Sequence, residues 1–257
     1  MSFLIVCVNV NSPVDEFKHM KVTFLGTGTC VDTSKAQSCI LIEGEETKIL
    51  VDVGVGAFVR LNDKIDEIDA VLLTHNHLDH NGDLLALLKA RWLKGANELL
   101  IFGPIGTKAF LDSLFEAYAY LRRKPKFKVS EEREFEIGEF KVRTIPTRHS
   151  IVSQAYVIES DGKRIVVSGD TSPFRELMEV ECDVLIHEMS LPSGKSEDHT
   201  TPENFAEVLP FCKAKVVYLT HMYPHAYEVK DKIVEQLKSV RNDIEFRIAE
   251  DLMSFEV

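Results

Sequence analysis

The sequence "LLTHNHLDHNGD", residues 72–83, places three histidines and an aspartate within six consecutive positions. Histidine offers a neutral nitrogen and aspartate an anionic oxygen, the ligands that suit zinc and related divalent metals. His75, His77 and Asp79 alternate along what we expect to be an extended loop, whereas His80 directly follows Asp79 and can point elsewhere. These four side chains can therefore serve two neighbouring ions. The alternative is a polar loop in which Asp79 only caps the helix that follows.

Other polar side chains stand where apolar, strand-like runs end. His149 follows "VRTIPTR", Asp170 follows "IVVSG" and His221 follows "VVYLT", and His187 follows "DVLI" in the same way. Because strand ends meet at one rim of a sheet, where open sheets commonly place ligand sites, we expect them to approach the loop of residues 75–80. Asp170 could then bridge two cations about 3.5 to 4 Å apart. Taken singly, His149 and His221 could equally be satisfied histidines at strand ends.

Glu188 and His199, in "HEMS" and "DHTT", lie outside this count of metal ligands. If Glu188 accepts a hydrogen bond from one ring nitrogen of His199, the other nitrogen can donate a proton to a leaving oxygen. We therefore expect the pair to act in general acid catalysis. The alternative for His199 is a cap for the helix predicted over "TPENFAEVL".

The two halves of the chain repeat one pattern of elements. Each half begins with short β-type runs and continues with alternating strand and helix patterns. The first three runs of the chain are typical of hairpins. Sheets and helices must both bury an apolar face, which predicts an α/β fold of two sheets packed face to face with helices outside. No low-complexity linker divides the halves, so we expect one domain over residues 20–257. Met20 opens a strand-like run, and residues 1–19 are interpreted as an N-terminal extension.

Composition limits the partners and the compartment. Among 257 residues, 30 Lys and Arg against 41 Asp and Glu give a net charge of −11, which provides no long-range attraction to a polyanion. The basic run "LRRKPKFK", residues 121–128, is interpreted as a solvated face in preference to a phosphate-binding one. Five cysteines without a C-x-x-C pair fit a reducing cytoplasm. No apolar run reaches the roughly 20 residues needed to span a membrane.

In order and context, these motifs resemble the metallo-β-lactamase fold, a four-layer αββα sandwich with a metal site at one edge. The resemblance runs from about residue 21 to the C-terminus and rests on "THNHLDH", His149, "SGDT" and "LTH" at His221. Within that superfamily, the chain looks most like the ribonuclease Z group, which has close equivalents of "FLGTGT", "IFGPIGTKAFL", "VSGDTSP", "LIHEMSL" and "DHTTPENFAEVL".

The resemblance implies a complete dinuclear site with a proton donor. It divides the ligands of two zinc ions, for which manganese or iron could substitute, into His75, His77 and His149 for one ion and Asp79, His80 and His221 for the other, with Asp170 as the bridge. His199 and Glu188 match the family's proton-donating pair. We therefore take Asp79, Glu188 and His199 as the candidate catalytic residues. Relatives of this kind are often dimers, so a homodimer is expected.

The chain departs from its relatives in several places. Many ribonuclease Z enzymes carry an arm that grips transfer RNA between the positions matching His149 and Asp170, and here only a short segment joins them. The basic loop after the first strand is reduced to "TSKAQS", which keeps Lys35, and "THMYPHA" lacks the arginine often found after the last ligand. The compact spacing is also similar to the cyclic-phosphate phosphodiesterases of phosphonate breakdown, although Cys30 and Cys39 cannot rebuild their structural zinc loop.

The sequence thus predicts a cytoplasmic dinuclear zinc hydrolase. Its expected substrate is a phosphodiester, either in RNA or in a small cyclic nucleotide or other phosphate diester. Two alternatives stay open. The same fold supports hydrolysis of a thioester or lactone, whose chemistry needs the metals but not necessarily His199. A metal-binding RNA-binding protein without activity would need no proton donor at all.

Overall fold

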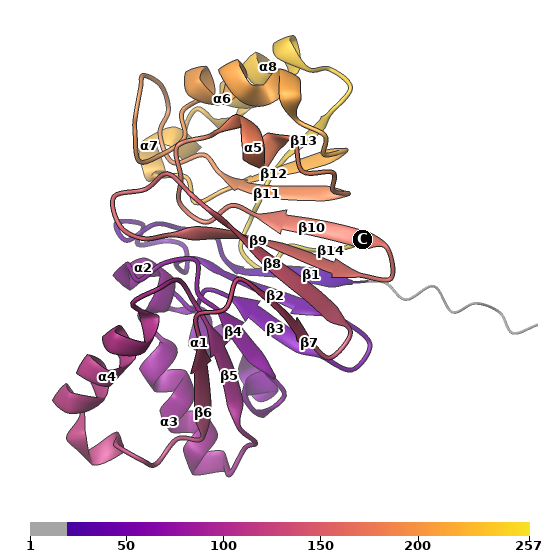
Figure 1. The fold of residues 1–257 in the computed structure, drawn as a ribbon. Helices are drawn as coiled ribbons and strands as arrows, with labels where there is room; N and C mark the ends of the chain where they lie inside the picture. Colours follow the sequence, from indigo (N-terminus) through magenta and orange to yellow (C-terminus); the bar gives the residue numbers. More distant parts are fainter. Residues whose placement is uncertain (1–19) are drawn as a thin grey trace, which may run out of the picture.

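The computed structural model describes residues 20–257, and the proposed extension, residues 1–19, lies outside the described residues. Within that range the strands form two sheets of seven strands each. Helices cover the outer face of both sheets (Figure 1). The four-layer αββα sandwich predicted from the sequence is therefore confirmed. Among the helices of the described range, none combines the length and the apolar character that crossing a membrane requires.

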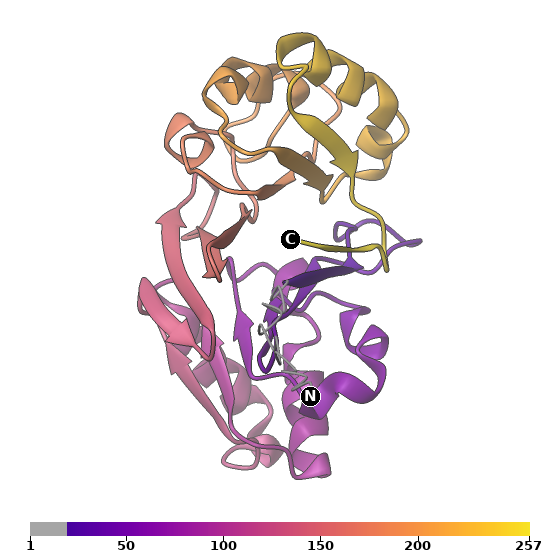
Figure 2. The same ribbon diagram turned by 90° about the vertical axis from the view of Figure 1, so that its right-hand side faces the viewer.

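The first sheet has the strand order β14-β1-β2-β3-β4-β5-β6. Its strands are β1 (Lys21–Gly26), β2 (Cys39–Glu43), β3 (Lys48–Val51), β4 (Ala70–Leu72), β5 (Leu99–Phe102), β6 (Phe127–Ser130) and β14 (Ser254–Glu256). Strands β1 to β3 are antiparallel neighbours, as the predicted hairpins require, whereas β3 to β6 run parallel. The C-terminal strand β14 pairs with β1, and Figure 2 shows this yellow segment returning to the indigo strands.

The second sheet repeats this plan with the order β13-β12-β11-β10-β9-β8-β7. Its strands are β7 (Glu134–Ile137), β8 (Phe140–Pro146), β9 (Gln154–Ser160), β10 (Lys163–Val167), β11 (Val184–Glu188), β12 (Val216–Thr220) and β13 (Glu245–Ile248). Strands β7 to β10 are antiparallel, and β10 to β13 run parallel. Strands β4, β10 and β12 end shortly before His75, Asp170 and His221, and β11 ends at Glu188.

Short and medium helices form the two outer layers. Those of the first half are α1 (Ala57–Arg60), α2 (Leu78–Asn81), α3 (Leu84–Lys94) and α4 (Thr107–Ala117), with the 3-10 turns η1 (Asn62–Asp66) and η2 (Ala119–Leu121). Those of the second half are α5 (Arg175–Met178), α6 (Pro202–Val208), α7 (Pro224–Tyr227) and α8 (Lys230–Val240), with the turn η3 (Leu209–Phe211). The predicted helix over "TPENFAEVL" is α6. Its cap is Thr201, whose side chain accepts from Asn204 N, and not His199.

Alternation along the strands divides the apolar side chains among three cores. Successive side chains of a strand point to opposite faces, so β1 and β2 send Phe24 and Ile42 between the sheets and Leu25 and Leu41 towards the helices. In the central core, the ring of Phe24 lies 5.5 Å from that of Tyr218 in the opposite sheet. Burial on both faces explains why the strands ahead of the site read as unbroken apolar runs.

Replacing Phe24 with alanine should lower the free energy of unfolding by about 3 to 5 kcal/mol, because its ring is fully buried where the two sheets meet. Urea unfolding measures the change. Val59→Ala is the control, since Val59 is 70% exposed and its truncation should change stability by less than about 0.5 kcal/mol. Equal effects of the two substitutions would contradict the packing described.

Candidate metal centre

The ligand-rich loop begins where β4 ends and continues into the single turn of α2. His75 is fully buried, and His77 has extended backbone angles, φ −72° and ψ 152°. Asp79 and His80 lie inside α2, so the loop is extended only as far as His77 and not to Asp79 as the alternation predicted. Helical neighbours diverge by about 100°. That turn explains how two adjacent residues present side chains in different directions, and Asp79 does not act as a helix cap.

One group of ligands consists of three imidazoles. His77 Nδ1 lies 3.1 Å from His75 Nε2 and 3.1 Å from His149 Nε2. His149 comes from the loop after β8, in the other sheet, so this group joins the two halves of the molecule. All three ligand atoms lie within 4.8 Å of one another, a spacing that fits a single metal ion.

A second group lies beside the first and shares a carboxylate with it. Asp79, His80 and His221 have ligand atoms within 4.8 Å of one another. The carboxylate of Asp170 lies between the groups: its oxygens are 3.4 Å from His80 Nε2, 3.3 Å from His221 Nε2 and 3.9 Å from His75 Nε2. The structure thus brings together all seven side chains that the sequence singled out as ligands.

Hydrogen bonds behind the ligands determine which ring nitrogens carry protons. The backbone carbonyl of Asp198 can only accept, so His149 Nδ1 donates to it at 2.9 Å. Thr74 Oγ1 donates to Asp52 at 2.9 Å and accepts from His75 Nδ1 at 3.0 Å. His80 Nδ1 donates to Asp52 at 2.7 Å. In neutral His75, His80 and His149 the Nε2 atoms are therefore bare lone pairs that point into the site.

A cation stabilises these bare nitrogens better than hydrogen bonds between the imidazoles can. A single proton on His77 Nδ1 would be shared between two acceptors, whereas a cation at the centre satisfies three nitrogens at once. His80 Nε2 and Asp170 Oδ1 are buried and have no hydrogen-bond partner among residues 20–257. Buried polar atoms without partners are costly, and two opposed electron-pair donors can be stabilised by a positive charge between them. The residues present therefore fit bound metal ions.

The pKa values of the buried members of this cluster shift in different directions, according to the charges beside each group. Burial lowers the pKa of His75 well below its usual range, and the charge of His80 acts in the same direction. Burial also lowers the pKa of His80, but the carboxylates of Asp170 and Asp52 outweigh it and raise that pKa well above normal. Burial raises the pKa of Asp170, whereas His221 and His80 together lower it well below normal. Asp170 is thus an anion held in a dry site.

Glu188 and His199 form the expected pair next to the ligands. Glu188 ends β11 and is almost fully buried, and its carboxylate accepts from Thr171 N at 3.1 Å and from Ser190 N at 2.8 Å. It also accepts from His199 Nδ1 at 3.0 Å. Burial lowers the pKa of His199, but the hydrogen bond and charge of Glu188 raise it to about 9. His199 Nδ1 lies 4.0 Å from Asp170, and its side chain is 21% exposed.

The sequence did not identify every contributor, and one histidine belongs elsewhere. Asp52, in "ILVDVG", and Thr74 orient two ligands, yet a single aspartate after a strand resembles an ordinary turn. The φ of Asp52 is +60°, a strained value that only the structure reveals. His187 lies inside β11 and not at its end, so its ring faces away from the site and sits 4.8 Å from that of Phe205 in α6.

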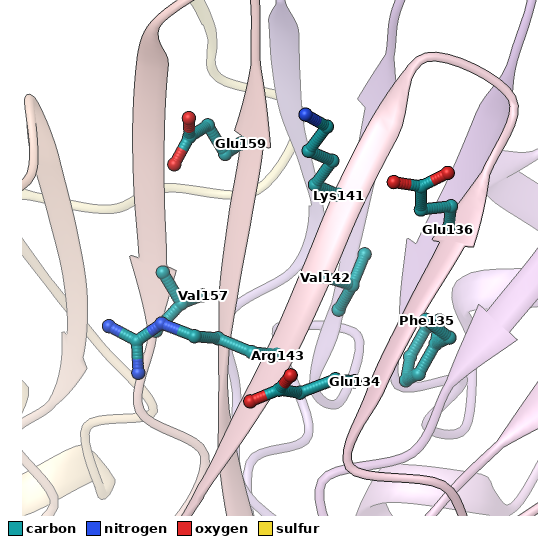
Figure 3. A pocket seen from close by; sticks show the side chains of 8 residues that line it. All are labelled: Glu134, Phe135, Glu136, Lys141, Val142, Arg143, Val157 and Glu159. Atoms are coloured by element: carbon teal, nitrogen blue, oxygen red, sulfur yellow. The ribbon is translucent and has the colours of Figure 1, made fainter.

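A hollow of about 420 Å³ on β7, β8 and β9 is separate from this centre (Figure 3). Charged side chains line it, among them Glu136, Lys141 and Glu159. The strand register places Lys141 opposite both of these glutamates. Opposite charges in neighbouring strands are the usual way in which a solvated sheet face is stabilised. None of the ligands described above lines this hollow.

Comparisons with known proteins find relatives of this chain both by sequence and by fold. The model of the metallo-beta-lactamase superfamily matches residues 33–221. A curated protein named ribonuclease Z, from Mycolicibacterium gilvum, is 28% identical over 93% of this chain and 96% of its own length.

Solved structures agree with these matches. The metallo-beta-lactamase fold protein YhfI from Bacillus subtilis is 24% identical with a TM-score of 0.79, over 93% of this chain and all of its own. The short form of human tRNase Z is 26% identical with a TM-score of 0.73, over 91% of this chain and 98% of its own. A diphosphatase from the PhnP family shares the fold at 18% identity and a TM-score of 0.71, over 93% and 98% of the two chains.

Replacing Asp52 with asparagine should weaken zinc binding by about 10- to 100-fold, because the amide cannot hold His80 and Thr74 as the carboxylate does. Competition against a chromogenic chelator measures the affinity, and circular dichroism checks that the variant is folded. Asp63→Asn, the same substitution at an exposed position in η1, should leave the affinity unchanged. A folded Asp52→Asn protein with wild-type zinc affinity would refute this role.

Proposed function

The chain belongs to the metallo-beta-lactamase superfamily as a metal-dependent hydrolase of the ribonuclease Z-like group, and we propose that it hydrolyses phosphodiester bonds in RNA with two zinc ions. The observation that carries this proposal is the pair of Glu188 and His199, with His199 Nδ1 4.0 Å from the carboxylate of Asp170. A protein that only stored or sensed metal would have no use for a half-buried, oriented proton donor at this place. The similarity to proteins named ribonuclease Z and tRNase Z supports RNA as the substrate class.

The ligand geometry divides naturally between two ions. His75, His77 and His149 would hold one, and Asp79, His80 and His221 the other, while Asp170 would reach both. When bound, two such ions lower the pKa of water and screen the negative charge of a phosphodiester. The chain's own contribution is to keep each ligand in one tautomer and one orientation, through Asp52, Thr74 and the carbonyl of Asp198.

In this mechanism His199 protonates the departing oxygen. Its Nδ1 is engaged by Glu188, so the proton that it transfers is on Nε2. Glu188 can hold the ring in place because two backbone N–H groups, those of Thr171 and Ser190, fix the carboxylate. Such an oriented acid typically accelerates a reaction by about 10²- to 10⁴-fold.

The same pair favours a phosphodiester over a thioester. A ribose oxygen leaves as a strongly basic alkoxide and needs a proton, whereas a thiol, with a pKa of about 8.5, leaves readily as its anion. A thioesterase on this fold would have no need of His199. The residues that the structure builds around His199 are therefore best explained by an oxygen leaving group.

Recognition of the RNA must differ from that of relatives that grip transfer RNA with an arm. Between His149 and Asp170 the chain contains a short loop, residues 150–153, and strands β9 and β10, which are joined by a tight turn at residues 161–162. Lys35, the remaining cation of the loop after β1, is 3.2 Å from Glu250 and lies over the ring of Tyr227 at 3.7 Å. Lys35 is thus held by the protein itself, which leaves substrate binding to other surfaces.

Replacing His199 with alanine should slow hydrolysis of a ribodinucleotide by about 10²- to 10⁴-fold without loss of metal. Hydrolysis of bis-p-nitrophenyl phosphate should fall much less, since p-nitrophenolate is a weakly basic leaving group. Steady-state rates on both substrates and metal analysis of the variant measure the two effects.

Two further variants complete this test. His77→Ala should lose metal and activity on both diesters, and His225→Ala, which removes an exposed histidine, should behave as wild type. The proton-donor role is wrong if His199→Ala releases the metals or slows both diesters equally. Faster turnover of a thioester than of either diester would overturn the phosphodiesterase proposal itself.

A further inference from the structure

The basic run of residues 121–128 lies far from the metal ligands in the fold. It connects η2 to β6, which runs parallel to β5, so it sits at the starting ends of these strands. The ligand loop follows the other end of β4, the parallel neighbour of β5. Figure 1 shows the connection between α4 and β6 at the bottom of the view, well below α2. Whatever this run binds is therefore bound outside the metal centre.

Some cations in and around residues 121–128 form ion pairs with neighbouring carboxylates, and others do not. Arg122 lies 3.9 Å from Glu116, and Lys128 lies 2.8 Å from Glu98. By contrast, the exposed side chains of Lys89, Lys124 and Lys126 make no ion pair within 4.0 Å anywhere in residues 20–257. These three cations give this surface a local positive charge in a chain with a net charge of −11, which suits an anionic partner.

Exposed aromatic rings lie beside these cations. Tyr118 is 48% exposed and Tyr120 is 53% exposed, and their ring centroids are 6.5 Å apart. Lys124 Nζ lies 4.8 Å from the ring of Trp92 in α3 and 5.8 Å from that of Tyr120. Lys89 Nζ lies 5.5 Å from the ring of Tyr120. Large exposed rings are costly in water, and here they form one surface with the lysines.

The backbone that carries these groups is firmly held. Leu121 is 2% exposed and anchors the segment in the core beneath α3 and α4. Phe127 stacks on Phe115 of α4, with ring centroids 5.2 Å apart. Lys124 N donates to the carbonyl of Leu121, which closes a turn between these anchors. The rings and lysines are thus presented on a fixed support.

A small recess on the α3 side adds to the charge pattern. Trp92, Lys124 and Lys126 line it, and none of its lining residues is acidic. On the opposite side of the segment, a different hollow of about 380 Å³ is bordered by Asp112 and Glu116 as well as by Arg122 and Arg123, so its charges balance. The observations therefore favour the α3 side. We call it the basic platform and define it by its six residues: Lys89, Trp92, Tyr118, Tyr120, Lys124 and Lys126.

We propose that the basic platform binds single-stranded nucleic acid, with bases stacked on Tyr118 and Tyr120 and phosphates contacted by Lys124, Lys126 and Lys89. Aromatic faces interleaved with cations are the chemistry that holds unpaired strands without reading their sequence. A folded duplex hides its base faces, and an acidic peptide or an anionic vesicle offers none, so those partners would leave the rings unused. The proposal does not depend on the hydrolase activity, because the platform and the metal centre are separate.

Binding is measured by the fluorescence anisotropy of labelled single-stranded oligomers of about 12 nucleotides. This length lies within the range of about 4 to 16 nucleotides that such surfaces usually cover. All proteins carry His199→Ala and zinc, which keeps cleavage slow while the chain stays intact. RNA and DNA oligomers of one sequence distinguish the two kinds of strand, and a poly-glutamate peptide and phosphatidylserine vesicles represent the other anions. Binding here and hydrolysis in the previous assays fail independently.

Tyr120→Ala should weaken oligomer binding by about 5- to 150-fold, the loss expected for one stacked base, and Tyr120→Phe should retain it. The double variant Lys124→Glu, Lys126→Glu should also weaken binding and make the salt slope shallower by about 0.7 per lost phosphate contact. Lys238→Glu, an exposed lysine of α8, is the matched control and should bind like the parent. Proteins that carry the same platform substitutions but keep His199 should hydrolyse bis-p-nitrophenyl phosphate at the wild-type rate.

Three results would overturn the proposal. One is oligomer binding that Tyr120→Ala and the double lysine variant leave unchanged in proteins shown to be folded by their melting temperatures. Another is a loss in Lys238→Glu equal to that in the platform variants. The last is tighter binding of the peptide or the vesicles than of either oligomer, which would assign the platform to a different class of partner.

Discussion

The metal centre depends on one constraint: acceptors behind the ligand histidines hold their outer nitrogens protonated, so that bare nitrogens converge inside. Asp52, Thr74 and the carbonyl of Asp198 impose this on His80, His75 and His149. The converging nitrogens and the carboxylate of Asp170 then leave a buried space that is satisfied by positive charge. The proposed catalysis rests on the same arrangement, because His199 is held beside that space by the carboxylate of Glu188, which two backbone N–H groups fix.

The fold serves this centre by bringing two sheets to one rim. Strand β4 of the first sheet and strands β10, β11 and β12 of the second all end there, and the loop after β8 adds His149. Each half supplies only part of each candidate ligand group, since His75 and His77 are completed by His149, and Asp79 and His80 by His221. The pairing of β14 with β1 and the contact of Phe24 with Tyr218 tie the halves together, which keeps the ligands at fixed distances.

Much of the fold and of the site could be predicted from the sequence, for reasons specific to each residue. His75, His77, Asp79 and His80 are adjacent in the chain, and His149, Asp170 and His221 each follow a strand, so spacing and residue type identify them. The sequence does not indicate Asp52, because its role is a hydrogen bond to His80, which lies 28 residues away in the chain. The backbone carbonyl of Asp198 has no sequence signal at all. His187 shows the opposite failure: β11 continues two residues beyond the apolar run, to Glu188, and the alternation of side chains turns the ring of His187 away from the site. The basic run alone indicates a solvated face, as charge runs usually do, and gives no signal of Trp92, which comes from α3 and lies beside Lys124.

The central claim is that seven side chains hold two metal ions, and metal analysis of the protein purified without added metal tests it most directly. The account predicts about two equivalents of zinc, or of a mixture with manganese or iron, for each chain. It predicts that His77→Ala and His221→Ala, which remove ligands of different ions, each lower this content. A correctly folded protein with no bound transition metal, and none taken up on dialysis against zinc, would contradict it.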